Sequence, residues 1–142
     1  MVELGQGLHD YDVALVAFLN GDGEGPAVVR RLAETVAAGR MLDEQQLTDL
    51  NALLGRTPVT ARLVDGGEGR YALEMRAVRV DPDRELAGSF ASLLRRAPDR
   101  LKRCEECGRY YLDSTRSRTR RWCTQQCGDR ARVRAHRARV SQ

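Results

Sequence analysis

Residues 104–127 have the sequence CEECGRYYLDSTRSRTRRWCTQQC and contain all four cysteines of the 142-residue chain. Two residues separate Cys104 from Cys107, and three separate Cys123 from Cys127. Zinc in structural sites takes a closed tetrahedron of four ligands, and two close cysteine pairs supply four thiolates economically. The spacing therefore predicts one structural zinc ion with all four cysteines as its ligands. Because the thiolates fill the tetrahedron, no coordination position is left for a catalytic water.

Other roles for these cysteines follow less well from the sequence. Residues 1–10 lack the basic start of a signal peptide, so we expect a cytoplasmic protein, in which thiols stay reduced and disulfides are rare. A thioredoxin-like redox pair would use Cys104 and Cys107 but leave the second pair idle, and no βαβ pattern surrounds it. An iron–sulfur cluster also takes four thiolates, and the spacing alone leaves that alternative open. No apolar run approaches the roughly 18 residues of a membrane span, so we expect no membrane partner.

The residues around the cysteines predict a small fold. Tyr110–Leu112 and residues 121–122 are expected to form the two strands of one hairpin, and residues 130–139 a helix. A cysteine turn, a hairpin, a second cysteine pair and a helix together outline a treble-clef-like finger. A unit this small needs its metal to fold. Its expected core consists of Tyr111, Leu112, Trp122 and Val133.

Charge is distributed very unevenly along the chain. Residues 1–99 carry eleven basic and sixteen acidic side chains, a balance of −5, whereas residues 100–142 carry thirteen basic and four acidic ones, a balance of +9. The chain prefers arginine over lysine throughout, so part of the arginine excess at the basic end is explained as ordinary solvated surface. That preference does not explain why acidic residues are scarce at this end. The asymmetry predicts a polyanionic partner for the basic end. Arginine grips phosphate and bonds guanine, so the expected nucleic-acid contacts are Arg116, Arg118, Arg120, Arg121, Arg130, Arg132, Arg134, Arg137 and Arg139.

The acidic front part predicts a helical domain with one hairpin. Apolar periodicity and breakers indicate helices within residues 8–20, 26–39, 43–55 and 81–98, and a hairpin with its turn at residues 66–69. Asp43 and Gln46 are spaced for a capping box, and Asp81 followed by Pro82 suits a helix start. The expected buried stripe of the third helix is Leu47, Leu50 and Leu54.

We find no catalytic constellation in the sequence. The two histidines, His9 and His136, lie far apart in segments of different character. The glycines at 21, 23 and 25 follow a predicted helix and not a strand, so they do not form a phosphate-binding loop. No serine stands in a nucleophile-elbow pattern. We therefore expect a protein that is not an enzyme.

Around the cysteines the sequence resembles a known family, the CGNR zinc finger. The stretches that carry the resemblance are Arg103-Cys-Glu-Glu-Cys-Gly, Tyr111-Leu-Asp-Ser-Thr-Arg, Arg121-Trp-Cys, Cys127-Gly-Asp-Arg-Ala and Arg134-Ala-His-Arg. Such proteins usually carry an N-terminal ABATE domain, described as a stress-induced transcription regulator, and the front part resembles it more loosely at residues 14–20, residues 50–54 and the hairpin. The resemblance implies a bacterial transcription factor with the four cysteines as ligands.

The chain departs from the family at Asp129, where the family has asparagine. Aspartate lacks the amide donor that would bond adenine and it repels phosphate. Aspartate and asparagine are nearly equal as caps and turn formers, so we interpret position 129 as a lock on the local backbone. Arg130 keeps the family residue and remains a candidate DNA contact.

These observations predict an α+β protein of two domains. Residues 1–99 form a mainly helical, ABATE-like domain with a β-hairpin, and residues 100–142 a CGNR-type C4 zinc finger of treble-clef-like fold with a basic C-terminal helix. We expect a zinc-dependent DNA-binding transcription regulator, associated with the nucleoid, whose main partner is double-stranded DNA. RNA polymerase and a second copy of the chain are further candidate partners. The alternatives are an RNA- or ribosome-binding protein and an interaction module that docks an acidic protein such as RNA polymerase.

Overall fold

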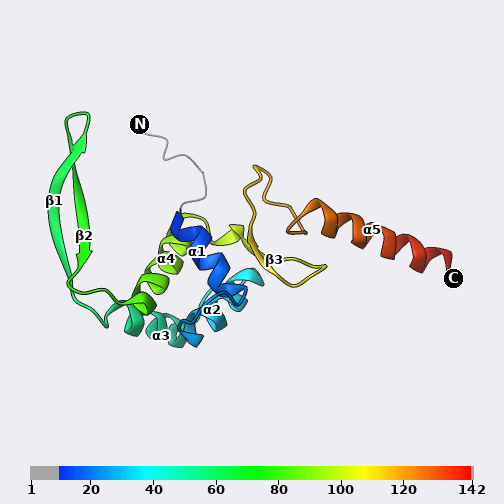
Figure 1. Ribbon diagram of the computed structural model, residues 1–142, viewed down its shortest axis with the longest axis horizontal. Coiled ribbons are helices and arrows are strands. Elements are labelled where there is room, and N and C mark those ends of the chain that lie inside the picture. The colour runs from blue at the N-terminus through cyan, green and yellow to red at the C-terminus, as the bar shows by residue number, and fades with distance from the viewer. Residues whose placement is uncertain (1–9, 142) are drawn as a thin grey trace.

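The computed structural model describes residues 10–141. Its elements are α1 (Asp10–Leu19), α2 (Ala27–Ala37), α3 (Glu44–Leu54), β1 (Val59–Gly67), β2 (Arg70–Ala77), α4 (Pro82–Arg96), the short 3-10 helix η1 (Pro98–Arg100), β3 (Leu101–Arg103), β4 (Tyr110–Leu112) and α5 (Gln125–Val140). Helices α1 to α4 form a central body, with the β1–β2 hairpin standing out at one end and α5 at the other (Figure 1). No helix in this part of the chain is long and apolar enough to cross a membrane.

Two of the helix starts follow directly from local sequence. Asp43 accepts a hydrogen bond from the Gln46 backbone N–H at 2.8 Å, and the Gln46 side chain accepts one from the Asp43 N–H at 3.0 Å, so the predicted capping box of α3 is confirmed. The side chain of Asp81 likewise accepts from the Arg84 N–H at 3.3 Å and starts α4 with Pro82 in its first turn. These bonds satisfy amide groups that the first turn of a helix leaves unpaired.

The core of the body is a single apolar cluster between the four helices. Its most buried large side chains are Leu15, Val29, Leu32, Phe90, Leu93 and Leu101. The stripe predicted for α3 is partly wrong, because Leu47 is 47% exposed and Leu53, not Leu47, is buried beside Leu50. Helix α3 packs against both α2 and α4, and this double contact selects a face that includes Leu53.

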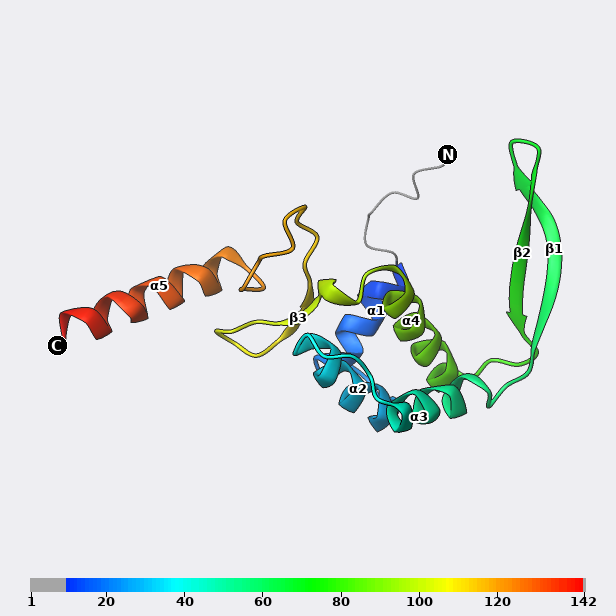
Figure 2. The same ribbon diagram turned by 180° about the vertical axis from the view of Figure 1, so that it is seen from behind.

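The predicted hairpin of the front part is confirmed. Strands β1 and β2 pair antiparallel, with Leu63 opposite Leu73 and a register irregularity between Asp65 and Gly67. The Gly67 N–H donates to the Asp65 side chain at 2.8 Å, which fixes the turn. We call this projecting hairpin, residues 59–77, the arm; the view from behind shows it equally clear of the helices (Figure 2).

A second, shorter hairpin joins the body to the cysteine-rich region. Strand β3 pairs antiparallel with β4, and Leu101 lies opposite Leu112. The expected pairing of Tyr110–Leu112 with residues 121–122 is therefore wrong: the partner of β4 precedes the first cysteine pair. Side chains alternate across the ribbon, so Leu101, 1% exposed, packs into the helical core while Tyr111 faces the cysteines.

This ribbon ties the two predicted domains together. Strand β3 packs against α2 and β4 against α1. The side chain of Asn20, at the end of α1, accepts a hydrogen bond from the Tyr110 N–H at 2.8 Å and donates one to the Tyr110 carbonyl at 3.0 Å. The core of the helical body thus continues past residue 99, and the division at 99/100 stays a prediction.

Candidate metal centre

The four cysteine sulfurs converge on one point. All four lie within 4.8 Å of one another. The Cys123 sulfur is 3.6 Å from that of Cys107 and 3.7 Å from that of Cys127. A tetrahedron with zinc–sulfur bonds of about 2.3 Å has edges of about 3.8 Å, so the separations fit a single zinc ion. They exceed the roughly 2.05 Å of a disulfide bond, and they are too short for a cluster whose thiolates bind different iron atoms.

Two different backbone structures bring the cysteine pairs together. Cys104 and Cys107 flank a tight turn between β3 and β4, closed by a hydrogen bond of 2.9 Å from the Gly108 N–H to the Cys104 carbonyl. Gly108 has φ +75, a left-handed conformation that glycine adopts without strain. Cys127 lies in the first turn of α5, where the Thr124 hydroxyl accepts from its N–H at 3.3 Å. Helix α5 therefore begins at Gln125, earlier than the predicted residue 130.

The thiols have unequal acidity before a metal binds. Burial raises the pKa of Cys104, but backbone N–H groups of Cys107, Cys123 and Glu106 outweigh it and lower that pKa to about 6. Burial and the neighbouring thiols raise the pKa of Cys123 to about 12. Thiolates, not thiols, bind zinc, so metal binding here must release protons, that of Cys123 among them.

A small packed cluster covers the metal site. Tyr111 is 7% exposed and packs with Cys104, Cys127 and the ring of Trp122. A β-carbon at Gly128 would lie 3.1 Å from the Trp122 ring, so a larger residue here would require the ring to shift by a few tenths of an ångström. Two members of the predicted core fall outside this cluster: Val133 is 49% exposed, and Leu112 packs against the helical body.

The segment between the cysteine pairs is organised by one buried carboxylate. Asp113, fully buried, accepts hydrogen bonds from Lys102 at 2.8 Å, from the Thr115 N–H at 3.0 Å and hydroxyl at 2.5 Å, and from the Arg120 N–H at 3.0 Å. Burial raises the pKa of Asp113, but these bonds, that of Lys102 foremost, hold it far below its usual range. The segment between the cysteine pairs has no strand pairing after β4. The hydrogen bonds to Asp113 hold its backbone in place instead.

Lys102 is the lone lysine in a chain that otherwise uses arginine. Its ammonium donates to Asp113 and to the backbone carbonyls of Arg118 and Arg120. A compact ammonium offers three rotatable donors, whereas a guanidinium is a planar fork. Sequence reasoning overlooked both Lys102 and Asp113, although the single exception to arginine usage was a visible signal.

The arginines predicted to contact nucleic acid are not equivalent. Arg120 turns inward, donates to the Trp122 carbonyl at 2.8 Å and to the Cys123 carbonyl, and so supports the second cysteine pair. Four others are in ion pairs: Arg118 with Asp99, Arg121 with Glu105, Arg132 with Asp129 and Arg134 with Glu106. Within residues 10–141, no ion-pair partner is present for Arg116, Arg130, Arg137 and Arg139.

All four acidic side chains of residues 100–141 are in ion pairs. Glu105, whose pKa is lowered by its hydrogen bond from Arg121, forms a largely exposed pair with that residue. Such exposed pairs are weak and screened by solvent, so phosphate can replace the carboxylate. Arg134 differs, because the side chain of its partner Glu106 is 6% exposed.

The interpretation of Asp129 as a backbone lock is wrong. The residue lies inside α5, and the capping role belongs to Thr124. Its carboxylate accepts from Arg132, three residues along the helix, at 3.0 Å. The Asp129 side chain therefore forms an ion pair with an arginine side chain and makes no bond that fixes the local backbone.

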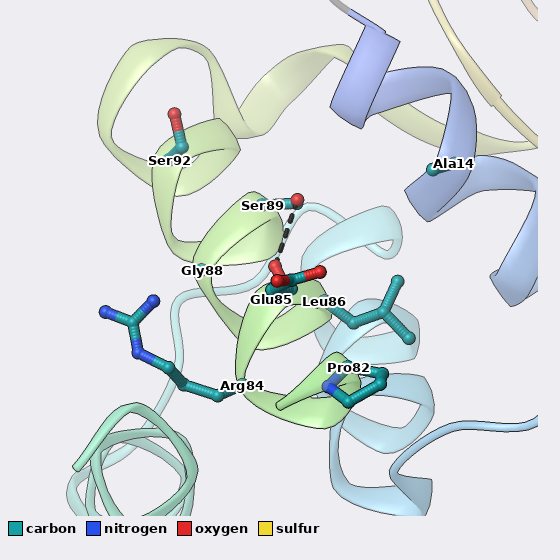
Figure 3. A pocket seen from close by; sticks show the side chains of 8 residues that line it. All are labelled: Ala14, Pro82, Arg84, Glu85, Leu86, Gly88, Ser89 and Ser92. Carbon is teal, nitrogen blue, oxygen red and sulfur yellow. Dashed lines mark hydrogen bonds between the residues drawn. The ribbon is translucent and has the colours of Figure 1, made fainter. Parts of the chain in front are cut away.

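A surface hollow of about 660 Å³ lies along α4 (Figure 3). The hydroxyl of Ser89 donates to the Glu85 carbonyl at 3.1 Å, and that of Ser92 accepts from Arg96 at 3.3 Å. Its lining, within the described residues, contains neither histidine nor cysteine. Both serine hydroxyls in the hollow are hydrogen-bonded within α4, so we assign no chemical role to the hollow.

Comparison with known families agrees with the cysteine geometry. Residues 100–140 match the CGNR zinc finger family. This range starts just before β3, includes all four cysteines and Trp122, and ends with α5. A search of curated proteins gave no match for the chain. Residues 100–140 are thus a zinc-finger domain whose clustered cysteines are consistent with one structural zinc, as the spacing predicted.

Proposed function

We propose that the zinc finger and α5 bind double-stranded DNA and that the protein is a transcription regulator. The observation that best supports this proposal is the exposure of α5. Every side chain from Arg132 to Ser141 is exposed, and the helix extends away from the body (Figure 1). A helix of this length without packing partners is marginal in water. A major groove about 12 Å wide admits a helix and offers it phosphates on both sides.

The anchoring of α5 supports this role. Its first turn contains Cys127, so the metal fixes the direction in which the helix leaves the finger. At 100° per residue, Arg130, Arg134 and Arg137 lie along one face, and Arg132 and Arg139 along the opposite one. Two basic faces on one slim helix suit contact with both walls of a groove. The turn between β3 and β4, together with a second pair at a helix start, supports a treble-clef fold.

The metal in this proposal is structural and the protein is not an enzyme. Four thiolates occupy the whole tetrahedron, so zinc would offer no site to substrate or water. It would hold the finger while the arginines bind. The family match does not extend into residues 1–99. An ABATE-like fold and a role in the stress response therefore remain predictions for that part.

The test is a titration of the zinc-loaded chain with duplex DNA of mixed sequence at several salt concentrations. If about six arginines contact phosphates, affinity falls roughly a thousandfold between 50 and 200 mM salt. Arg137→Ala should weaken binding and reduce the logarithmic salt slope by about 0.9 without releasing zinc. Arg95→Ala is the matched control, because it removes the same charge from an exposed position of α4.

The outcomes separate the candidate partners. Absence of salt-dependent duplex binding would refute the proposal. Displacement of the duplex by structured RNA at equal concentration would select an RNA-binding protein. Binding to an acidic protein such as RNA polymerase, with Arg137→Ala impaired there but not on DNA, would select an interaction module. Equal loss in Arg95→Ala and Arg137→Ala would show only a net-charge effect.

A further inference from the structure

The arm is a two-stranded sheet that nothing in the described chain covers. All its strand side chains are exposed except those of Val64 and Ala77, which are half-buried. Figures 1 and 2 show it standing clear of the helices from both sides. An isolated two-stranded hairpin is marginally stable in water, and sheets gain stability by covering an apolar face. The arm therefore lacks the layer that would stabilise it.

The two faces of the arm differ sharply in character. Residues paired across the two strands lie on the same face of the sheet, so the strand register shows which side chains lie on each face. The polar face carries Thr60, Arg62, Glu74 and Arg76, with the apolar pair Val64 and Ala72 nearer the tip. The apolar face carries Val59, Ala61, Leu63, Tyr71, Leu73 and Met75. Of these, Tyr71 is 79% exposed, Leu63 66% and Leu73 64%. A continuous apolar patch this exposed marks an interaction surface.

We propose that the apolar face of the arm binds the same face of a second copy of the chain, forming a two-fold dimer with the arms antiparallel. A two-fold interface uses one patch twice, and an almost uncharged sheet face is complementary to itself. The exposed area of the five large side chains is on the order of 500 Å² per arm. Two arms together would bury at most roughly 1,000 Å², the size of a weak or transient interface.

Charge at the two ends of the arm favours the antiparallel arrangement. The tip carries Asp65, the one charged residue on the apolar face within the strands. The base carries Arg79, two residues after the end of β2. Neither has an ion-pair partner within residues 10–141. An antiparallel pair places each Asp65 near Arg79 of the second copy, whereas a tip-to-tip pair would bring the two Asp65 carboxylates together.

The arrangement leaves both zinc fingers accessible. The arm and α5 lie at opposite ends of the long axis (Figure 1), so a dimer formed through the arms presents α5 at each outer end. This inference does not depend on DNA as the partner of the finger. It rests on the uncovered apolar face of the arm and on the charges at its two ends.

The experiment is sedimentation equilibrium of the full-length, zinc-loaded chain up to on the order of 100 μM, well above a micromolar dissociation constant. The wild-type chain should approach twice its 15.9 kDa mass. Leu63→Asp places a charge on the apolar face and should give a monomer. Thr60→Asp is the matched control: it adds the same charge to the same strand on the opposite face and should remain dimeric. Circular dichroism checks that both variants keep the wild-type helical signal.

Amide hydrogen exchange gives a second readout. Backbone amides of residues 59–77 should become protected as the concentration rises in the wild type and in Thr60→Asp, but not in Leu63→Asp. A wild-type monomer over the whole range would overturn the proposal, even if another protein bound the arm. A dimer that persists in Leu63→Asp would place the interface elsewhere and overturn it too.

Discussion

The hydrogen bonds of Asn20 give the sharpest test of how the helical body and the zinc finger depend on each other. Asn20 directly follows α1, and its amide pairs with both backbone groups of Tyr110, 90 residues away, at 2.8 and 3.0 Å. Both bonds are half-buried, so Asn20→Ala leaves one N–H and one carbonyl of β4 without these partners. The substitution removes no large apolar side chain, which isolates the effect of the two bonds.

The expected cost follows from those two bonds. Each hydrogen bond contributes about 0.5–1.5 kcal/mol net, so Asn20→Ala should lower the free energy of unfolding by about 1–3 kcal/mol. For a chain of this length, that corresponds to a Tm about 3–10 °C lower. Urea unfolding followed by far-UV circular dichroism measures the free energy, and a thermal scan measures the Tm. Asn51→Ala, at an exposed position of α3, is the matched control and should change stability by less than about 0.5 kcal/mol.

Zinc removal separates a tether to the finger from a local effect on α1. Without zinc the turn that positions β4 loses its metal anchor, so Tyr110 is held against Asn20 only by the packing of the ribbon on the helices. The cost of Asn20→Ala should then shrink well below its value in the zinc-loaded chain, as expected for coupled sites. A cost that is equal with and without zinc, or no larger than that of Asn51→Ala, would refute the reasoning.

Three further predictions concern the finger. Asp113→Ala strands the ammonium of Lys102, which is 23% exposed, and should destabilise the finger by about 3–5 kcal/mol; urea unfolding should show little change for the exposed control Thr119→Ala. Lys102→Arg keeps the charge but not the three-acceptor geometry, so we expect a loss of about 1–3 kcal/mol, and wild-type stability would contradict that geometric argument. Chelation of zinc should shift the fluorescence of Trp122, the single tryptophan, and reduce the helical signal as α5 frays; an unchanged spectrum would mean that the cluster around Trp122 does not depend on the metal.

Much of the local structure could be predicted because its causes lie within a few residues. The capping box of α3 needs only Asp43 and Gln46, and the turn of the arm needs only its glycines and Asp65. The metal site is also local in origin, since each cysteine pair lies within one turn of chain. In each case the interacting residues are close in sequence, so the local sequence pattern is enough to predict the structure.

The same reasoning failed where partners are distant. The strand partner of Tyr110–Leu112 could be Leu101–Arg103 or residues 121–122, and both are short and close to a cysteine pair. The choice depends on which ribbon can bury Leu101 and Leu112 against the helices while turning Tyr111 toward the metal. Sequence periodicity does not contain that information. It likewise could not show which arginines would be ion paired, since the carboxylate partners of Arg118 and Arg134 lie 19 and 28 residues away.

The sequence by itself therefore determined four cysteines placed to hold one zinc ion, a hairpin among helices, and a basic end separate from an acidic front. Only the tertiary structure decided that the β3–β4 ribbon belongs to both halves, that Asn20 holds it, and that the half-buried Arg120 supports the metal site. The physical reason is the range of the interactions. Thiolate spacing, capping and turn chemistry act over a few residues, whereas burial and pairing depend on which distant surfaces meet.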